Sequence, residues 1–170
     1  MAILNSIYLT QIGILEIKAT SEHITAVLFT KTLKTQDRIV ESSQFAKSDH
    51  PLIHTYEKQL EEYFNGQRMK FDLPIKQEGS PFQQKVWAAL TGIPYGSTLS
   101  YFELSSRIGN IKAIRAVGTS NGKNSLSIIV PCHRVIGKNG ELTGYAGDLW
   151  RKKWLLDHEG KYANCVQTLF

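Results

Sequence analysis

Two similar helix-start patterns constrain the fold of this chain more than any other feature. Ser80-Pro81-Phe82-Gln83 and Ser100-Tyr101-Phe102-Glu103 both place a serine three residues ahead of a glutamine or glutamate. In this arrangement, a capping box, each side chain bonds the backbone N–H beside the other and fixes the first turn of a helix. Gly109 ends the second helix, and Asn110 can cap a third helix that continues through Lys123. Two short helices joined by a tight glycine turn are typical of a helix-turn-helix.

The first half of the chain shows strand patterns followed by a helix pattern. Ile12–Ile17 and Ile24–Phe29 are rich in β-branched residues, and a polar turn separates them. Apolar residues then recur at helical spacing from Pro51 until Asn65, and Met69–Leu73 fits a further short strand. We therefore expect a small α/β domain here.

The two halves of the chain differ in net charge. Residues 1–78 hold 9 Lys and Arg and 10 Asp and Glu, a net charge of −1, whereas residues 79–170 hold 11 and 5, a net charge of +6. The polar segment Lys76–Gly79 is a plausible linker, so we expect two domains, 1–78 and 79–170. A basic half favours an acidic partner, most often nucleic acid. The triplet Arg151-Lys152-Lys153 is equally typical of a solvated helix face.

Composition argues against several classes of protein. No run approaches the roughly 18 apolar residues of a transmembrane helix. Met1–Thr10 lacks a basic region followed by an apolar core, so we expect no signal peptide and a cytoplasmic protein. The two cysteines, Cys132 and Cys165, give no support to a secreted disulfide framework. His23 and His54 have no cluster of Cys or Asp around them, and we expect no metal site.

A cysteine and a histidine stand side by side after an apolar run. Ile128–Val130 predicts a buried strand that ends at Pro131, because proline cannot extend a β-ladder. Cys132 would then lie at the strand end beside His133, with Arg134 nearby. A thiol reacts as its thiolate, and an adjacent imidazole or cation raises the thiolate fraction. A nucleophilic cysteine and a buried structural cysteine both fit this pattern.

The motifs around the cysteine carry a family resemblance. They are Lys112-Ala113-Ile114-Arg115-Ala116-Val117-Gly118, Asn121, Gly122, Asn124, Pro131-Cys132-His133-Arg134, Gly144-Tyr145-Ala146-Gly147 and Trp154-Leu155-Leu156-Asp157-His158-Glu159-Gly160. From about Ser80 to Lys161, this pattern resembles the O6-alkylguanine-DNA alkyltransferases, which move an alkyl group from damaged guanine onto their own cysteine. The resemblance implies a ribonuclease-H-like α/β N-terminal domain and a mainly helical C-terminal domain with a winged helix-turn-helix. It also implies a monomer that acts on double-stranded DNA without a cofactor, and without the zinc that some members bind through N-terminal cysteines.

The resemblance assigns roles around the cysteine. Cys132 would accept the alkyl group irreversibly from O6-alkylguanine, with O4-alkylthymine left open as a second substrate. His133 would act as its base through a water, and Glu159 would orient His133. Asn124 would join the DNA-binding and cysteine segments through hydrogen bonds, whereas His158 is expected at the surface. The residues implied to contact the extruded guanine are Tyr101, Tyr145 and the backbone around Val135 and Ala146.

Small residues dominate the expected third helix. A slim face permits close approach to the narrow minor groove, and equally permits tight packing against another helix. The resemblance implies minor-groove binding without sequence specificity, with Arg115 filling the space that an extruded guanine leaves. Extrusion is needed because a base inside a duplex cannot present its alkyl carbon to a thiol. The implied DNA contacts are Ala113, Arg115, Ala116, Gly118, Thr119 and Lys123.

Two other functions fit parts of the pattern. A thiol hydrolase could use Cys132, His133 and Glu159; it would turn over repeatedly and need not bind DNA. A non-catalytic DNA-binding regulator could use the helix-turn-helix and ignore the cysteine. Against the regulator, the slim helix lacks the Asn, Gln and multiple Arg side chains that read base edges.

Overall fold

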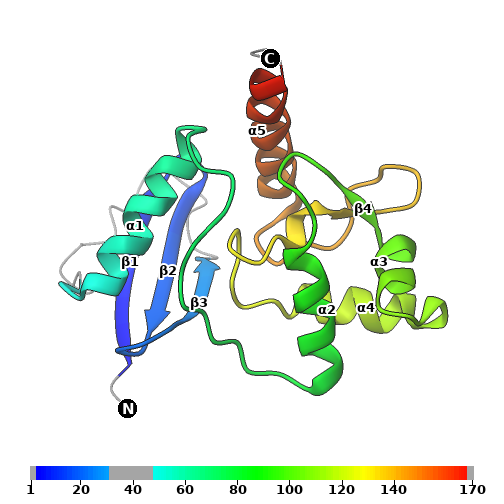
Figure 1. Ribbon diagram of the computed structural model, residues 1–170, viewed down its shortest axis with the longest axis horizontal. Helices are drawn as coiled ribbons and strands as arrows, with labels where there is room; N and C mark the ends of the chain where they lie inside the picture. Colours follow the sequence, from blue (N-terminus) through cyan, green and yellow to red (C-terminus); the bar gives the residue numbers. More distant parts are fainter. Residues whose placement is uncertain (1–2, 31–47, 168–170) are drawn as a thin grey trace. The chain divides into compact units, whose positions relative to one another are not determined.

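The computed structural model describes residues 3–30 and 48–167. It divides into two compact units, Met1–Gln77 and Glu78–Phe170 (Figure 1). The expected fold class is confirmed, with a small sheet in the N-terminal unit and a mostly helical C-terminal unit. In the part of the chain that the structure describes, no helix is long and apolar enough to cross a membrane.

In residues 3–30 and 48–77, the N-terminal unit is a three-stranded antiparallel sheet with one helix. Its elements are β1 (Leu4–Thr10), β2 (Gly13–Ala19), β3 (Ile24–Phe29) and α1 (Pro51–Phe64), with the strands in the order β1-β2-β3. Leu15, Ile17 and Ala19 alternate along β2 and are fully buried, as the period of a half-buried strand requires. From α1, Tyr56 and Leu60 add fully buried side chains at helical spacing.

Two details of this unit differ from the sequence expectations. β1 was not predicted, because its residues Leu4–Thr10 mix polar and apolar types and only Ser6 among them is buried. Met69–Leu73 forms no strand. Instead, the side chain of Gln59 on α1 holds this segment, donating to the Asp72 carbonyl and accepting from the Asp72 N–H, both at 2.9 Å. After the segment, Ile75 makes an isolated β-bridge to Ile24.

The C-terminal unit is built from helices and one very short sheet. Its elements are α2 (Pro81–Thr91), β4 (Leu99–Ser100), α3 (Tyr101–Arg107), η2 (Ile111–Ala113), α4 (Ile114–Gly122), η3 (Cys132–Arg134), β5 (Val135–Ile136) and α5 (Leu149–Gln167), with β4 and β5 paired in parallel. Both capping boxes are confirmed, since Ser80 and Ser100 each accept from a backbone N–H three residues on and receive the reciprocal bond. α3, η2 and α4 form the helix-turn-helix, with Gly109 at φ +78° in the turn.

The third helix of this unit starts differently from the sequence expectation. Asn110 caps a single 3-10 turn, and the α-helix begins only at Ile114. Val117 on α4 is fully buried, and the Trp87 indole of α2 donates to the Ser120 carbonyl at 2.8 Å. α4 is therefore fixed to α2 along one side.

The strand expected at Ile128–Val130 is not present. These residues form turns, and Ile128 has a φ of +72°, which a β-branched residue rarely adopts. The run is nevertheless buried, with Ile128 and Val130 each 1% exposed. An apolar β-branched run here marks a buried, tightly turned segment, and the strand follows the cysteine instead, as β5.

Candidate active site and DNA-binding face

The Cys132 thiol lies in η3, where the side-chain amide of Asn124 holds it. Cys132 is 5% exposed, and Asn124 Nδ2 donates to its Sγ at 3.0 Å. The same amide nitrogen donates to the Val130 carbonyl at 2.8 Å, while Asn124 Oδ1 accepts from the Leu126 N–H at 3.0 Å. One buried asparagine thus fixes both the turned segment before the cysteine and the sulfur itself.

The environment of this thiol acts on its pKa in two directions. Burial raises the pKa of Cys132, while the Asn124 hydrogen bond and the positive charge of Lys152 lower it. Burial prevails, so at neutral pH the undisturbed site holds a protonated thiol. The sequence led us to expect Arg134 to stabilise the thiolate, but the cation that acts on the sulfur is Lys152.

His133 and Glu159 form a buried pair beside the cysteine. Glu159 comes from α5, and its Oε1 lies 2.7 Å from His133 Nε2 with neither side chain exposed to solvent. Burial lowers the pKa of His133, although Glu159 acts to raise it. A neutral imidazole that donates Nε2–H to the carboxylate keeps an acceptor lone pair on Nδ1. That Nδ1 is buried and has no hydrogen-bond partner among the described residues.

Glu159 is held by three further donors. Arg134 donates from Nε to Oε2 at 2.8 Å and from Nη2 to Oε1 at 3.0 Å, and the Gly96 N–H donates to Oε2 at 3.2 Å. Burial alone would raise the pKa of Glu159, but the charges and hydrogen bonds of His133 and Arg134 outweigh it and lower the pKa far below the usual range. Glu159 is therefore a carboxylate whose position is fixed from both oxygens.

Gly96 shows why the chain needs a glycine in the turn after α2. Its φ is +72°, and a Cβ there would lie 2.5 Å from Ala163 Cβ and 3.3 Å from the Glu159 carbonyl oxygen on α5. Only glycine brings its backbone N–H this close to the Glu159 carboxylate without strain.

Lys152 is a functional candidate that the sequence interpretation missed. Its side chain on α5 has no exposed surface, and Nζ donates to the Thr143 carbonyl at 2.8 Å. The ammonium also lies 5.9 Å from the centroid of the Tyr101 ring. Burial lowers the pKa of Lys152 to about 8, against the opposing effect of Cys132. In sequence it stands inside a basic triplet, and no local signal separates it from a solvated lysine.

Tyr101 and Tyr145 bring the loop of residues 143–147 to the same site. Tyr101, at the start of α3, donates its hydroxyl hydrogen to the Thr143 carbonyl at 3.2 Å. Burial raises the pKa of Tyr101, and negative charge on Cys132 would add to that shift. Gly144 has a φ of +52°, and a Cβ there would lie 3.6 Å from the Tyr101 hydroxyl. The Tyr145 hydroxyl is buried, and burial raises its pKa well above the usual value, with Cys132 adding to the shift.

Of the remaining residues of the expected base contact, Val135 lies in β5 and Ala146 lies in this loop. Val135 is fully buried in β5, where it pairs with Leu99, and Ala146 is exposed. Arg151 fixes the end of the loop: its guanidinium donates to the Gly147 carbonyl and to Asp148 Oδ2, both at 3.2 Å. A solvated face is thus wrong for Arg151 and Lys152, and of the basic triplet only Lys153 is exposed.

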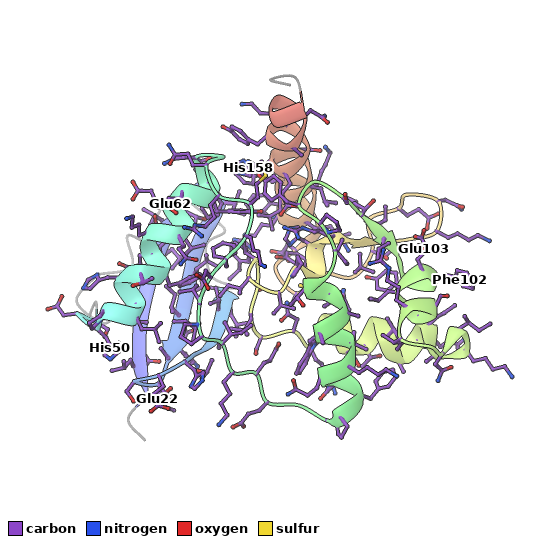
Figure 2. All side chains as sticks on the ribbon, viewed as in Figure 1. Glu22, His50, Glu62, Phe102, Glu103 and His158 are labelled. Carbon is purple, nitrogen blue, oxygen red and sulfur yellow. The ribbon has the colours of Figure 1, made fainter. Side chains whose placement is uncertain are left out.

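The surface expectation for His158 is also wrong. His158, which Figure 2 labels on α5, is 8% exposed. Its ring stacks on Trp154 at a centroid distance of 4.8 Å and meets Tyr162 edge-on at 4.9 Å. Trp154, His158 and Tyr162 recur every four residues on α5. That spacing was the available sequence signal, since residues four apart are neighbours on a helix.

The slim helix α4 presents a positively charged outer face. Arg115, Ala116, Thr119 and Lys123 are exposed, while Ala113 and Gly118 are partly exposed. Gly118 approaches Tyr101, whose ring carbons would lie 3.8 Å from a Cβ at this glycine. The structure thus joins the expected DNA-binding helix to the site that contains Cys132 within one compact unit.

Comparison with known proteins identifies the family. Residues 81–161 match the family described as 6-O-methylguanine DNA methyltransferase, DNA binding domain, and residues 3–77 match its ribonuclease-like domain. A constitutive methylated-DNA–protein-cysteine methyltransferase from Bacillus subtilis is 57% identical over 97 residues, which are 57% of this chain and 59% of that protein. The protein of that name from Methanosarcina acetivorans is 48% identical over 130 residues, 76% of this chain and 79% of its own. The chain belongs to the 6-O-methylguanine DNA methyltransferase family.

Solved structures agree over nearly the whole chain. The crystal structure of the Mycobacterium tuberculosis O6-methylguanine methyltransferase superposes with a TM-score of 0.81 at 37% identity, covering 95% of this chain and 94% of that one. The M. tuberculosis OGT crystallised in complex with DNA gives a TM-score of 0.80 at 39% identity and covers 93% of both chains. Both units of the fold are therefore shared with these relatives.

Proposed function

We propose that this protein repairs DNA by transferring the alkyl group of O6-alkylguanine onto its own Cys132. The observation that carries the proposal is the buried thiol held by Asn124 at 3.0 Å, beside the His133–Glu159 pair at 2.7 Å. An activated cysteine needs a donor for its negative charge, a base for its proton, and a group that orients the base. Asn124, His133 and Glu159 fill these roles, and Lys152 adds a positive charge.

The reaction is a single displacement. His133 takes the thiol proton through a water, and Sγ of Cys132 attacks the alkyl carbon. The bond between that carbon and O6 breaks and its electron pair passes to the guanine. The proton that His133 accepted leaves to solvent, from which the guanine takes up one proton and becomes neutral. The thioether is stable, so each molecule acts once and needs no cofactor. O4-alkylthymine presents a similar alkyl–oxygen bond, and the same assay with that base in the duplex decides whether it is a second substrate.

The substrate base must leave the duplex to reach a buried sulfur. We infer that α4 binds the minor groove, that Arg115 fills the vacated space, and that Tyr101 and Tyr145 contact the extruded base together with the backbone near Val135 and Ala146. Support comes from the exposure of Arg115 on α4 and from the proximity of Tyr101 to both α4 and Lys152. We further infer a cytoplasmic monomer that binds DNA through Ala113, Ala116, Gly118, Thr119 and Lys123 without sequence preference.

The test counts products per protein molecule. The protein is incubated with an excess of duplex DNA containing O6-methylguanine, and restored guanine is measured over time. We expect a plateau at one guanine per protein. Continued turnover would instead indicate a thiol hydrolase, and DNA binding without any product would indicate a regulator; either result overturns the proposal.

A further inference from the structure

Two large apolar side chains stand exposed beside Arg115. Ile111 in η2 is 54% exposed and Ile114 at the start of α4 is 38% exposed. Ile111 lies three residues before Ile114, and Arg115 follows Ile114 directly. These three residues lie within five positions at the start of α4, and we call them the apolar cluster at Arg115.

Neither isoleucine is fully buried by the fold, and both keep apolar surface in solvent. Ile is a weaker helix former than Ala, and its stiff β-branched side chain gives no benefit at an exposed position. Elsewhere the outer face of α4 carries only small or polar residues, such as Ala116 and Thr119. Large apolar side chains are thus exposed only at the start of this helix, close to Arg115.

The charge around the cluster indicates what covers it. Residues 101–124 contain four basic side chains, those of Arg107, Lys112, Arg115 and Lys123, against the single acidic Glu103, a net charge of +3. Glu103 is itself committed to the capping box, where its carboxylate accepts from the Ser100 N–H and hydroxyl. Apolar side chains surrounded by basic ones fit duplex DNA, whose phosphates are negatively charged and whose stacked base faces are apolar.

We propose that Ile111 and Ile114 form an apolar wedge that enters a base step in the minor groove next to Arg115 and bends the duplex. This inference rests on the proposed function. Minor-groove proteins that insert apolar side chains partly unstack a step and kink the helix, and Ile is among the residues they use. A step opened beside Arg115 weakens the stacking of the adjacent base, so the wedge assists extrusion before any chemistry occurs.

The test measures binding and bending on undamaged DNA, so it does not depend on alkyl transfer. Ile111→Ala, Ile114→Ala and the double variant are compared with the whole wild-type protein, using a duplex labelled at both ends for energy transfer. We expect Ile114→Ala to weaken duplex binding about tenfold, equivalent to about 1.4 kcal/mol, and to reduce the bend, with a larger loss in the double variant. Ile114→Leu keeps the bulk and should retain both properties.

Two controls separate the wedge from other effects. Lys112→Ala should lower the slope of log affinity against log salt by about 0.9, whereas the isoleucine variants should leave that slope unchanged because they remove no charge. Leu9→Ala removes a 75% exposed side chain from the N-terminal unit and should change neither binding nor bending.

Three results would overturn the wedge. The first is an Ile111/Ile114 double variant that binds and bends duplex like the wild type. The second is an equal loss on single-stranded DNA, which has no stacked duplex step to enter. The third is altered self-association in sedimentation with DNA affinity intact, which would make the cluster a contact between protein copies. Failure of the proposed function shows separately, as a wild type that bends DNA but restores no guanine.

Discussion

Glu159→Gln is the sharpest perturbation of the site, because four donors converge on this carboxylate. Oε1 accepts from His133 Nε2 and Arg134 Nη2, and Oε2 accepts from Arg134 Nε and the Gly96 N–H. Glutamine keeps one oxygen and replaces the other with an NH₂ donor. Whichever oxygen is replaced, two donors then face a donor, and the Arg134 guanidinium stays buried without a counter-charge.

The expected cost follows from that geometry. Hydrogen bonds to charged groups contribute about 1.5–3 kcal/mol each, and breaking a buried ion pair from one side costs about 3–5 kcal/mol. For a chain of this size each kcal/mol shifts the unfolding midpoint by about 2–4 °C, so Glu159→Gln should lower it by about 6–20 °C. Calorimetry of the unfolding transition measures this directly.

The matched control is the exposed ion pair on the same helix. Lys153 Nζ lies 2.6 Å from Asp157 Oδ2, with both side chains 65% exposed. Asp157→Asn should cost about 0.5 kcal/mol or less. If Glu159→Gln destabilises the protein no more than Asp157→Asn does, the reasoning that places a fixed, structurally essential carboxylate behind His133 is wrong.

The pH dependence of the free energy of unfolding tests the His133–Glu159 pair. The pKa of His133 is lowered in the folded protein by burial, so unfolding takes up a proton below the ordinary histidine pKa of 6.5. The pKa of Glu159 is also lowered, so its contribution is present above 4.5 and is lost as the pH falls below that value. Wild-type stability should therefore decline from about pH 6.5 downward, in two stages, and the second stage should be smaller in Glu159→Gln, where Glu103 still has a lowered pKa.

Three further experiments test the site and the DNA-binding face. Lys152→Met should raise the unfolding midpoint, because a pKa of about 8 shows that the fold disfavours the buried ammonium. It should also shift the rate of reaction with free O6-benzylguanine to higher pH, because the thiol loses its positive neighbour; an unmoved pH profile would contradict that role. Arg115→Ala should slow repair of duplex DNA severely at saturating DNA while sparing the reaction with free O6-benzylguanine, and equal loss on both substrates would exclude the extrusion role. Binding to undamaged duplexes should fall steeply with salt and vary little with sequence, as titrations at several salt concentrations on unrelated sequences can check.

Local signals made much of the fold predictable from the sequence. The capping boxes at Ser80 and Ser100 and the glycine at 109 act within a few residues, so the helices they bound form where the sequence places them. The same holds for α1, whose apolar spacing reflects one buried face. Pairing of His133 with Glu159 was reached through the family resemblance, since 26 residues separate the two positions.

Tertiary contacts explain what the sequence did not reveal. Ile128–Val130 has the composition of a strand, but the hydrogen bonds of Asn124 turn the segment back on itself. Lys152 can be buried because its ammonium donates a hydrogen bond to the Thr143 carbonyl, nine residues away on a loop. Arg134 pairs with Glu159 and not with the thiol beside it. The local sequence pattern predicts none of these three contacts.

The identity of the atom that receives the alkyl group is the most direct test. The protein is incubated with duplex DNA containing O6-methylguanine, its intact mass is measured, and the modified peptide is mapped for the wild type and for Cys132→Ser. We expect one methyl group on the wild-type protein, located on Cys132 Sγ, and none on the variant, which should still bind DNA. A methyl group on Cys165, or an unmodified wild-type protein after guanine has been restored, would contradict transfer to Cys132.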